Sequence, residues 1–135
     1  MAIYDTLQTG NRNVAREILD QEVVVSAYID TSDKNLGSGD YYKLFDYGAN
    51  TIINEIHVIT ETVEGAAETL DITDDTAGTT TLVSNHDLNT DNALSKYTTG
   101  LFKATAGQIS IKPDAALTVC KFFVVAKLIK LSTDY

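Results

Sequence analysis

The sequence predicts an all-β fold, an antiparallel β-sandwich or jelly roll of about eight strands with an N-terminal arm and one short helix. Its 135 residues include 11 Ile, 10 Val and 18 Thr, β-branched residues that fit a pleated sheet better than a helix. Apolar and polar residues alternate in several segments, which recur about every 8 to 14 residues with turn-forming residues between them. A chain of this length forms one domain and buries a core without disulfide bonds, so a single sandwich is expected.

The first twenty residues differ from the rest of the chain. The first ten lack periodicity, and we interpret them as an arm, with a frayed terminus as the alternative. A short helix is expected to follow, capped by Asn11 or Asn13. Val14 and Ile18 lie four residues apart and share one face of that helix. The predicted organisation is therefore an arm and short helix over residues 1–20 and a β-sandwich domain over residues 21–135.

Eight strands are expected after this segment. The third is expected to face inward with Ile52, Ile56, Val58 and Thr60. Because Ile53 breaks that alternation, a β-bulge is expected near Asn54. The polar residues 84–92 are predicted to form an irregular loop, and the last strand, apolar on both faces, is expected to be a central one. The strands are expected over residues 23–30, 41–47, 51–62, 69–73, 79–83, 97–104, 108–112 and 117–131.

The net charge of −9 excludes two classes of partner. Nucleic-acid backbones and anionic membrane surfaces attract clustered cations, whereas residues 44–95 contain ten acidic residues and no Lys or Arg. Six lysines follow from Lys96 onward. No stretch approaches the roughly 20 apolar residues that span a bilayer, and the N-terminus lacks the pattern of a signal peptide. We therefore expect a soluble protein that is made without export and binds neither nucleic acid nor membrane.

No metal-ligating, cofactor-binding or redox-active residue is predicted. His57 and His86 have no second His or Cys at ligand spacing, so each is expected to be an exposed or interface side chain. Cys120 is the only cysteine and lies in an apolar run, which favours a buried, unreactive thiol. No cofactor is expected.

The acidic residues also predict no specific site. Asp71, Asp74 and Asp75 form a local carboxylate cluster that could suit calcium, but turns require the same residue types. Ser84, His86 and Asp87 supply the residue types of a hydrolase without the strand-to-helix turn that such an enzyme uses. No catalytic residue is therefore predicted.

Tyrosines indicate an interaction surface. Four of the seven, Tyr28, Tyr41, Tyr42 and Tyr47, lie within twenty residues, and Tyr is enriched at protein interfaces. Some of these rings are expected in the core instead. Lys121 and Lys127 interrupt the apolar last strand, either as protection against edge aggregation or as contacts to an acidic partner.

The order of the strands and turns resembles a known group. Residues 42–53 read as a strand, the turn Gly48–Ala49–Asn50 and a second strand, followed by residues 57–62, a small-residue hairpin and residues 69–72. Residues 107–112 and 122–131 complete the pattern. This order is similar to small β-sandwich virion proteins of tailed bacteriophages, which serve as capsid decoration (cement) proteins or related head and tail accessory proteins. The turn at residues 73–78 has fewer glycines than that group carries.

The resemblance implies a structural virion protein without an active site, a decoration protein that binds and stabilises the assembled head. It implies synthesis in the host cytoplasm and a place on the capsid surface. The implied partners are the major capsid protein or other virion subunits, together with further copies in a homo-oligomer, a trimer being favoured. Under this interpretation Ile3, Tyr4 and Leu7 of the arm contact the shell, and Tyr41 and Tyr42 lie at a subunit interface.

Three alternatives stay open. Another head or tail role, such as an adaptor or a fibre base, predicts binding to one vertex or tail ring. A carbohydrate-binding β-sandwich module predicts an exposed strip of aromatic rings, and the absence of Trp weakens it. A small hydrolase predicts turnover in an activity screen.

Overall fold

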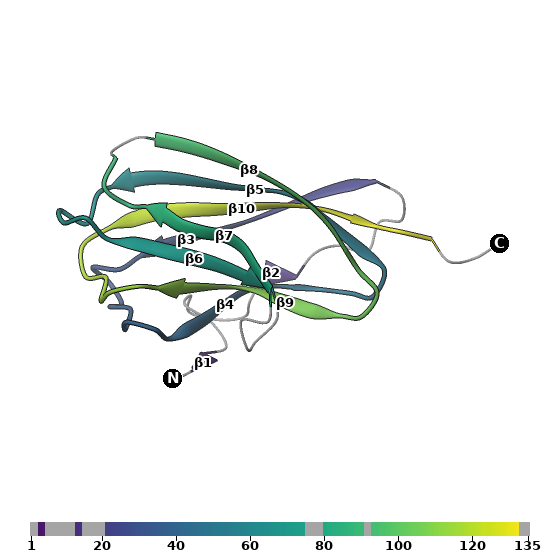
Figure 1. The fold of residues 1–135 in the computed structure, drawn as a ribbon, viewed down its shortest axis with the longest axis horizontal. Helices are drawn as coiled ribbons and strands as arrows, with labels where there is room; N and C mark the ends of the chain where they lie inside the picture. Colours follow the sequence, from purple (N-terminus) through teal and green to yellow (C-terminus); the bar gives the residue numbers. More distant parts are fainter. Residues whose placement is uncertain (1–2, 5–12, 15–20, 75–79, 91–92, 133–135) are drawn as a thin grey trace.

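Two β-sheets face each other in the computed structural model of the protein (Figure 1). The structure describes residues 3–4, 13–14, 21–74, 80–90 and 93–132. The strands are β1 (Ile3–Tyr4), β2 (Asn13–Val14), β3 (Glu22–Asp30), β4 (Tyr41–Tyr47), β5 (Thr51–Thr62), β6 (Thr69–Asp74), β7 (Thr80–Asp87), β8 (Ala93–Lys103), β9 (Gly107–Pro113) and β10 (Lys121–Lys130).

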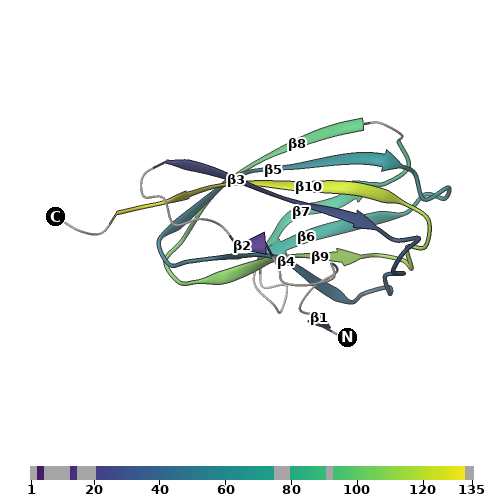
Figure 2. The same cartoon turned by 180° about the vertical axis from the view of Figure 1, so that it is seen from behind.

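The two sheets have the orders β1-β4-β9-β6-β7 and β3-β10-β5-β8. Pairing among the eight longer strands is antiparallel, whereas the two-residue strands β1 and β2 both pair with β4 in parallel. The predicted all-β sandwich is therefore confirmed. Figure 2 shows the layers from the other side, with β10 between β3 and β5. The prediction of a central last strand is also confirmed, although the strand begins at Lys121 rather than at residue 117.

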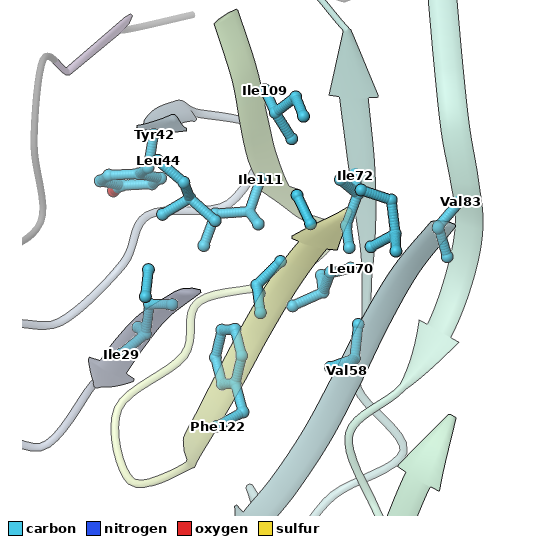
Figure 3. Packing of buried hydrophobic residues seen from close by; sticks show 14 of the residues in the cluster. Ile29, Tyr42, Leu44, Val58, Leu70, Ile72, Val83, Ile109, Ile111 and Phe122 are labelled. Carbon is cyan, nitrogen blue, oxygen red and sulfur yellow. The ribbon is translucent and has the colours of Figure 1, made fainter. Parts of the chain in front are cut away.

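The core lies between the sheets and consists mainly of β-branched and aromatic side chains. Phe122 and Val58 of one sheet point toward Leu70 and Ile72 of the other (Figure 3), and all four are fully buried. Phe45 is also fully buried. Close packing of this kind makes the sandwich a rigid body, because side chains in a dense core have little room to move.

The predicted bulge in β5 is confirmed, and it corrects one inward residue. The register with β8 shifts between Ile53 and Glu55, and the register with β10 shifts opposite the same segment. The extra residue reverses the side-chain alternation. As a result Ile53 is fully buried, while Ile52, which was expected inside, lies half-buried on the opposite face.

Three other expectations are wrong. Asn13 and Val14 form a strand along β4 and not the start of a helix; the rest of that predicted helix lies outside the described residues. Strand β7 continues to Asp87, since His86 pairs with Leu70 and Asp87 with Thr69, so part of the predicted loop is sheet. Strand β8 begins at Ala93, four residues before the expected start.

Candidate interaction surfaces

The two histidines take different positions in the fold. In the ranges that the structure describes, no group of three His, Cys, Asp or Glu side chains could hold a metal ion. His57 lies on the outer side of β5 with its Nε2 2.8 Å from Glu55 Oε1. His86 was expected to be exposed in a loop, but it lies in β7 and is 3% exposed. That expectation is wrong because His86 finds a partner in the opposite sheet.

His86 links the two sheets through Tyr97 of β8. Its Nδ1 lies 2.6 Å from the Tyr97 hydroxyl, and the two rings meet edge to face with centroids 5.8 Å apart. Burial lowers the pKa of His86, and the nearby Asp87 opposes this shift. Ser84 and Asp87 are exposed while His86 points into the sandwich, so the three residue types of a hydrolase do not come together.

Asp74 is a buried counterion. One of its oxygens accepts a hydrogen bond from the Tyr47 hydroxyl, and the other lies 2.6 Å from Lys103 Nζ. Gly107 makes this arrangement possible, because a Cβ there would lie 2.5 Å from the Tyr47 hydroxyl oxygen. Asp71 is instead half-buried and accepts the Asn85 N–H at 2.8 Å. These two carboxylates of the predicted cluster therefore have separate partners; Asp75 lies outside the described residues.

One end of the sandwich is held together by a carboxylate. Glu64 Oε1 accepts the backbone N–H groups of Thr118, Val119 and Cys120 at 3.0, 3.1 and 3.1 Å. Burial raises the pKa of Glu64, but these donors together outweigh it and the net pKa is lowered. The carboxylate thereby fixes the loop that precedes the central strand β10.

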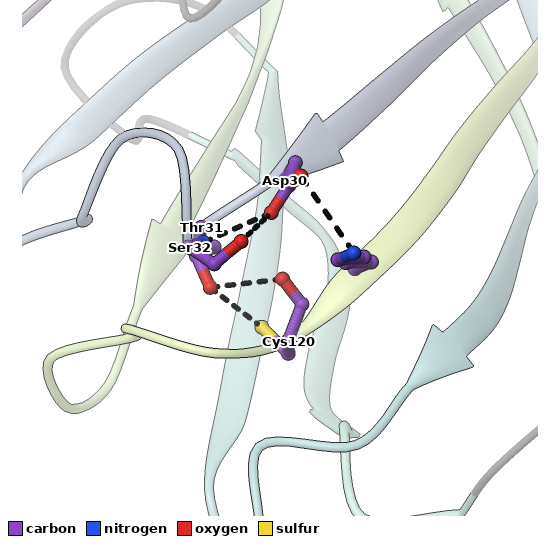
Figure 4. Close-up of polar contacts among 5 residues, drawn as sticks. Asp30, Thr31, Ser32 and Cys120 are labelled. Carbon is purple, nitrogen blue, oxygen red and sulfur yellow. Dashed lines mark hydrogen bonds and ion pairs between the residues drawn. The ribbon is translucent and has the colours of Figure 1, made fainter.

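The neighbouring loop is joined at the same end (Figure 4). Asp30 accepts the Ser32 N–H at 3.0 Å, and Thr31 Oγ1 donates to the Cys120 carbonyl at 2.8 Å. Cys120 is buried, as predicted, and burial raises the pKa of its thiol to about 12. Its thiol is therefore unreactive at neutral pH.

An apolar surface covers the outer side of the sheet β3-β10-β5-β8, which we call the outer face. Leu94, Val24, Phe102 and Tyr28 are 58%, 56%, 51% and 37% exposed. The Tyr28 and Phe123 rings pack with centroids 4.7 Å apart. This outer face was not predicted from the sequence. The last strand is apolar on both sides, and that pattern is typical of a strand that other elements cover on both sides.

Cross-strand register arranges the outer face in four rows. The first row is apolar, the last row is apolar except for Glu22, and the middle rows carry Lys96, Lys127 and Glu55. From one end of the strands to the other, the rows are Tyr28–Phe123–Ile59–Leu94, Ser26–Val125–His57–Lys96, Val24–Lys127–Glu55–Thr98 and Glu22–Ile129–Ile52–Phe102.

The predicted interface residues gather at one edge of the other sheet. Ile3 and Tyr4 form β1 and pair with Tyr41 and Tyr42, while Leu7 lies outside the described residues. Tyr41 and Tyr42 are only 6% and 3% exposed, and the Tyr42 hydroxyl accepts the Gly37 N–H at 2.6 Å. Their side chains offer little area to a second subunit, so their interface role stays a prediction.

Lys121 and Lys127 of β10 have close acidic neighbours. Lys121 Nζ lies 4.0 Å from Asp30, and Lys127 pairs across the strands with Glu55. Neither of the two proposed roles for these lysines is tested by this arrangement. No helix among the described residues is long and apolar enough to cross a membrane.

Sequence comparison finds no matching protein-family model and no matching characterised protein. Two solved structures contain chains with the same fold. One is the capsid of Ralstonia phage GP4, with a TM-score of 0.62 and 11% identity, covering 97% of this chain and 98% of that chain. The other is the capsid asymmetric unit of cyanophage Pam1, with a TM-score of 0.57 and 16% identity, covering 83% and 84%. At these identities the similarity establishes the shared fold.

Proposed function

We propose that this chain is a structural protein of a tailed-phage particle, and specifically a capsid decoration (cement) protein. One observation carries the proposal: the fold matches a chain from the capsid of Ralstonia phage GP4 over almost the full length of both chains. The second neighbour also comes from a phage capsid.

The chemistry of the described residues supports a binding role. The buried polar groups, Asp74 with Lys103 and His86 with Tyr97, join the two sheets to each other. A decoration protein requires a rigid body that binds the assembled shell and not its free subunits. Such binding stabilises the shell by mass action, and many linked copies add avidity.

The arm and the tyrosine pair form one candidate contact region. Because β1 pairs with the start of β4, the proposed shell residues Ile3 and Tyr4 lie directly beside Tyr41 and Tyr42. We place the major capsid protein or another virion subunit against this edge, with Leu7 in the same contact. The protein is made in the host cytoplasm and joins the capsid surface as a homo-oligomer under this proposal.

The test is binding to isolated heads. Purified protein is mixed with phage heads that lack it and, separately, with unassembled major capsid protein, and bound protein is measured after sedimentation. We expect saturable binding to heads, no binding to free subunits, and heads that disassemble at a higher temperature. A double variant with Ile3→Asp and Tyr4→Asp tests the edge formed by β1. Thr81→Asp is the control, because Thr81 is an exposed residue of β7. Absence of binding to heads refutes the proposal, and binding at one vertex indicates an adaptor or a fibre base.

A further inference from the structure

We propose that the outer face of β3-β10-β5-β8 binds the same face of a second copy of this chain, around a two-fold axis parallel to the strands and between β10 and β5. This inference goes beyond the proposed function and does not rest on it. Figures 1 and 2 show the four strands side by side in the order that this contact requires.

The register makes the face complementary to itself. Rotation about this axis places β10 of one copy over β5 of the other and keeps each row opposite the same row. Phe123 then faces Ile59 of the second copy, and Ile129 faces Ile52, so apolar side chains meet apolar ones. In the third row Lys127 faces Glu55 of the second copy, and the symmetry forms this ion pair twice.

The alternative axis, across the strands, lacks this match. This axis places each strand over the same strand of the second copy and reverses the order of the rows. Lys127 would then face the apolar Val125 of the second copy, so its pairing with Glu55 would stay within one copy and these residues would form no ion pair between the two copies. The charge pattern therefore selects the axis along the strands.

The charge of the face also permits self-association. The whole chain has a net charge of −9, so two copies repel each other through most surfaces. The four rows of the outer face are neutral overall, because two lysines stand among two carboxylates. These residues are Lys96, Lys127, Glu22 and Glu55.

The area of the face predicts a weak contact. With strands about 4.8 Å apart and a rise of about 3.3 Å for each residue, the face measures roughly 20 by 25 Å, or roughly 500 Å². Two such faces bury roughly 1,000 Å², near the lower limit for a specific interface. We therefore expect a dissociation constant of roughly 10 to 100 µM.

Sedimentation velocity from about 1 µM to about 500 µM tests the proposal, and the expected result is a reversible doubling of mass. Leu94→Lys and Lys127→Glu should each raise the dissociation constant by about ten-fold or more. Val119→Lys is the matched control, because Val119 is 47% exposed and lies in a loop outside the face. Combining Lys127→Glu with Glu55→Lys should restore association, since the exchanged charges again face each other.

Cross-linking tests the axis itself. When a Phe123→Cys protein is mixed with an Ile59→Cys protein, a short bismaleimide should join the two. Mixing the Phe123→Cys protein with an Ile129→Cys protein should give far less product, because these two rows lie about 20 Å apart along the strands. The native Cys120 is buried and does not interfere. Thermal melting of each variant verifies that it is folded. A mass that never doubles in this range overturns the proposal and leaves the face to another partner. A doubling that Leu94→Lys and Lys127→Glu both leave unchanged also overturns it.

Discussion

Replacing Lys103 with Met should destabilise the protein strongly, because it leaves the Asp74 carboxylate buried without a cation. Asp74 is completely buried at the end of β6, and Lys103 Nζ lies 2.6 Å from its oxygen. Methionine keeps a similar length and apolar stem, so the substitution removes mainly the charge.

The expected magnitude follows from the burial of both groups. Removing one partner of a buried ion pair costs about 3–5 kcal/mol, since the remaining charge has lost its compensation. The Lys103 side chain is 25% exposed, and Tyr47 still donates to Asp74, so the lower end of that range applies. We expect a loss of about 3 kcal/mol, which is a roughly 150-fold change in the unfolding equilibrium.

Urea unfolding at pH 7 measures this effect. With a slope of about 1.5 kcal/mol per molar urea, the midpoint should fall by about 2 M. Lys96→Met is the matched control, because Lys96 is an exposed lysine on the same strand; it should change stability by less than about 0.5 kcal/mol. Adding Asp74→Asn to Lys103→Met should recover about 1 kcal/mol or more, since a neutral amide replaces the uncompensated charge. If Lys103→Met behaves like Lys96→Met, the reasoning about this ion pair is wrong.

Three further predictions concern Glu64, His86 and Cys120. Glu64→Gln should lower the free energy of unfolding by about 1–2 kcal/mol, since a neutral acceptor replaces the carboxylate that binds three N–H groups. In the native protein, the contribution of the Glu64 carboxylate to stability should disappear as the pH falls below about 4.5, because the fold lowers the pKa of Glu64. The pKa of His86 is also lowered in the folded state, so the unfolded chain takes up a proton first and stability should fall as the pH decreases below about 6.5. His86→Gln should therefore reduce the difference in unfolding free energy between about pH 7.5 and about pH 5.5. An unchanged difference contradicts this assignment. The Cys120 thiol, whose pKa is about 12, should react with a thiol reagent at pH 8 only after urea unfolds the chain, so rapid labelling of the folded protein refutes its burial.

Local sequence patterns predicted those strands that have clear turn residues at both ends. Strand β4 begins and ends where expected, since turn residues precede it and Asn50, with a φ of 59°, turns the chain after it. The bulge near Asn54 was also predictable from a run of isoleucines. Which isoleucine faces inward was not, because that depends on the pairing with β8 and β10.

The burial of His86 and Asp74 depended on partners in the opposite sheet. His86 and Asp74 read as residues of polar turns, yet each is buried by a group that the fold brings to it, Tyr97 for one and Lys103 for the other. The outer face was missed for a related reason. The sequence shows that β10 is apolar on both sides, but only the two-layer architecture shows that no third sheet of the described residues covers one of those sides.

The copy number of this protein in purified phage particles tests the central proposal most directly. Quantitative mass spectrometry of intact particles gives the ratio of this chain to the major capsid subunit. A decoration protein predicts a fixed ratio in which copies occupy equivalent positions over the whole head. A few copies in each particle would contradict decoration and indicate a vertex or tail role, and absence from the particles would contradict a structural virion function altogether.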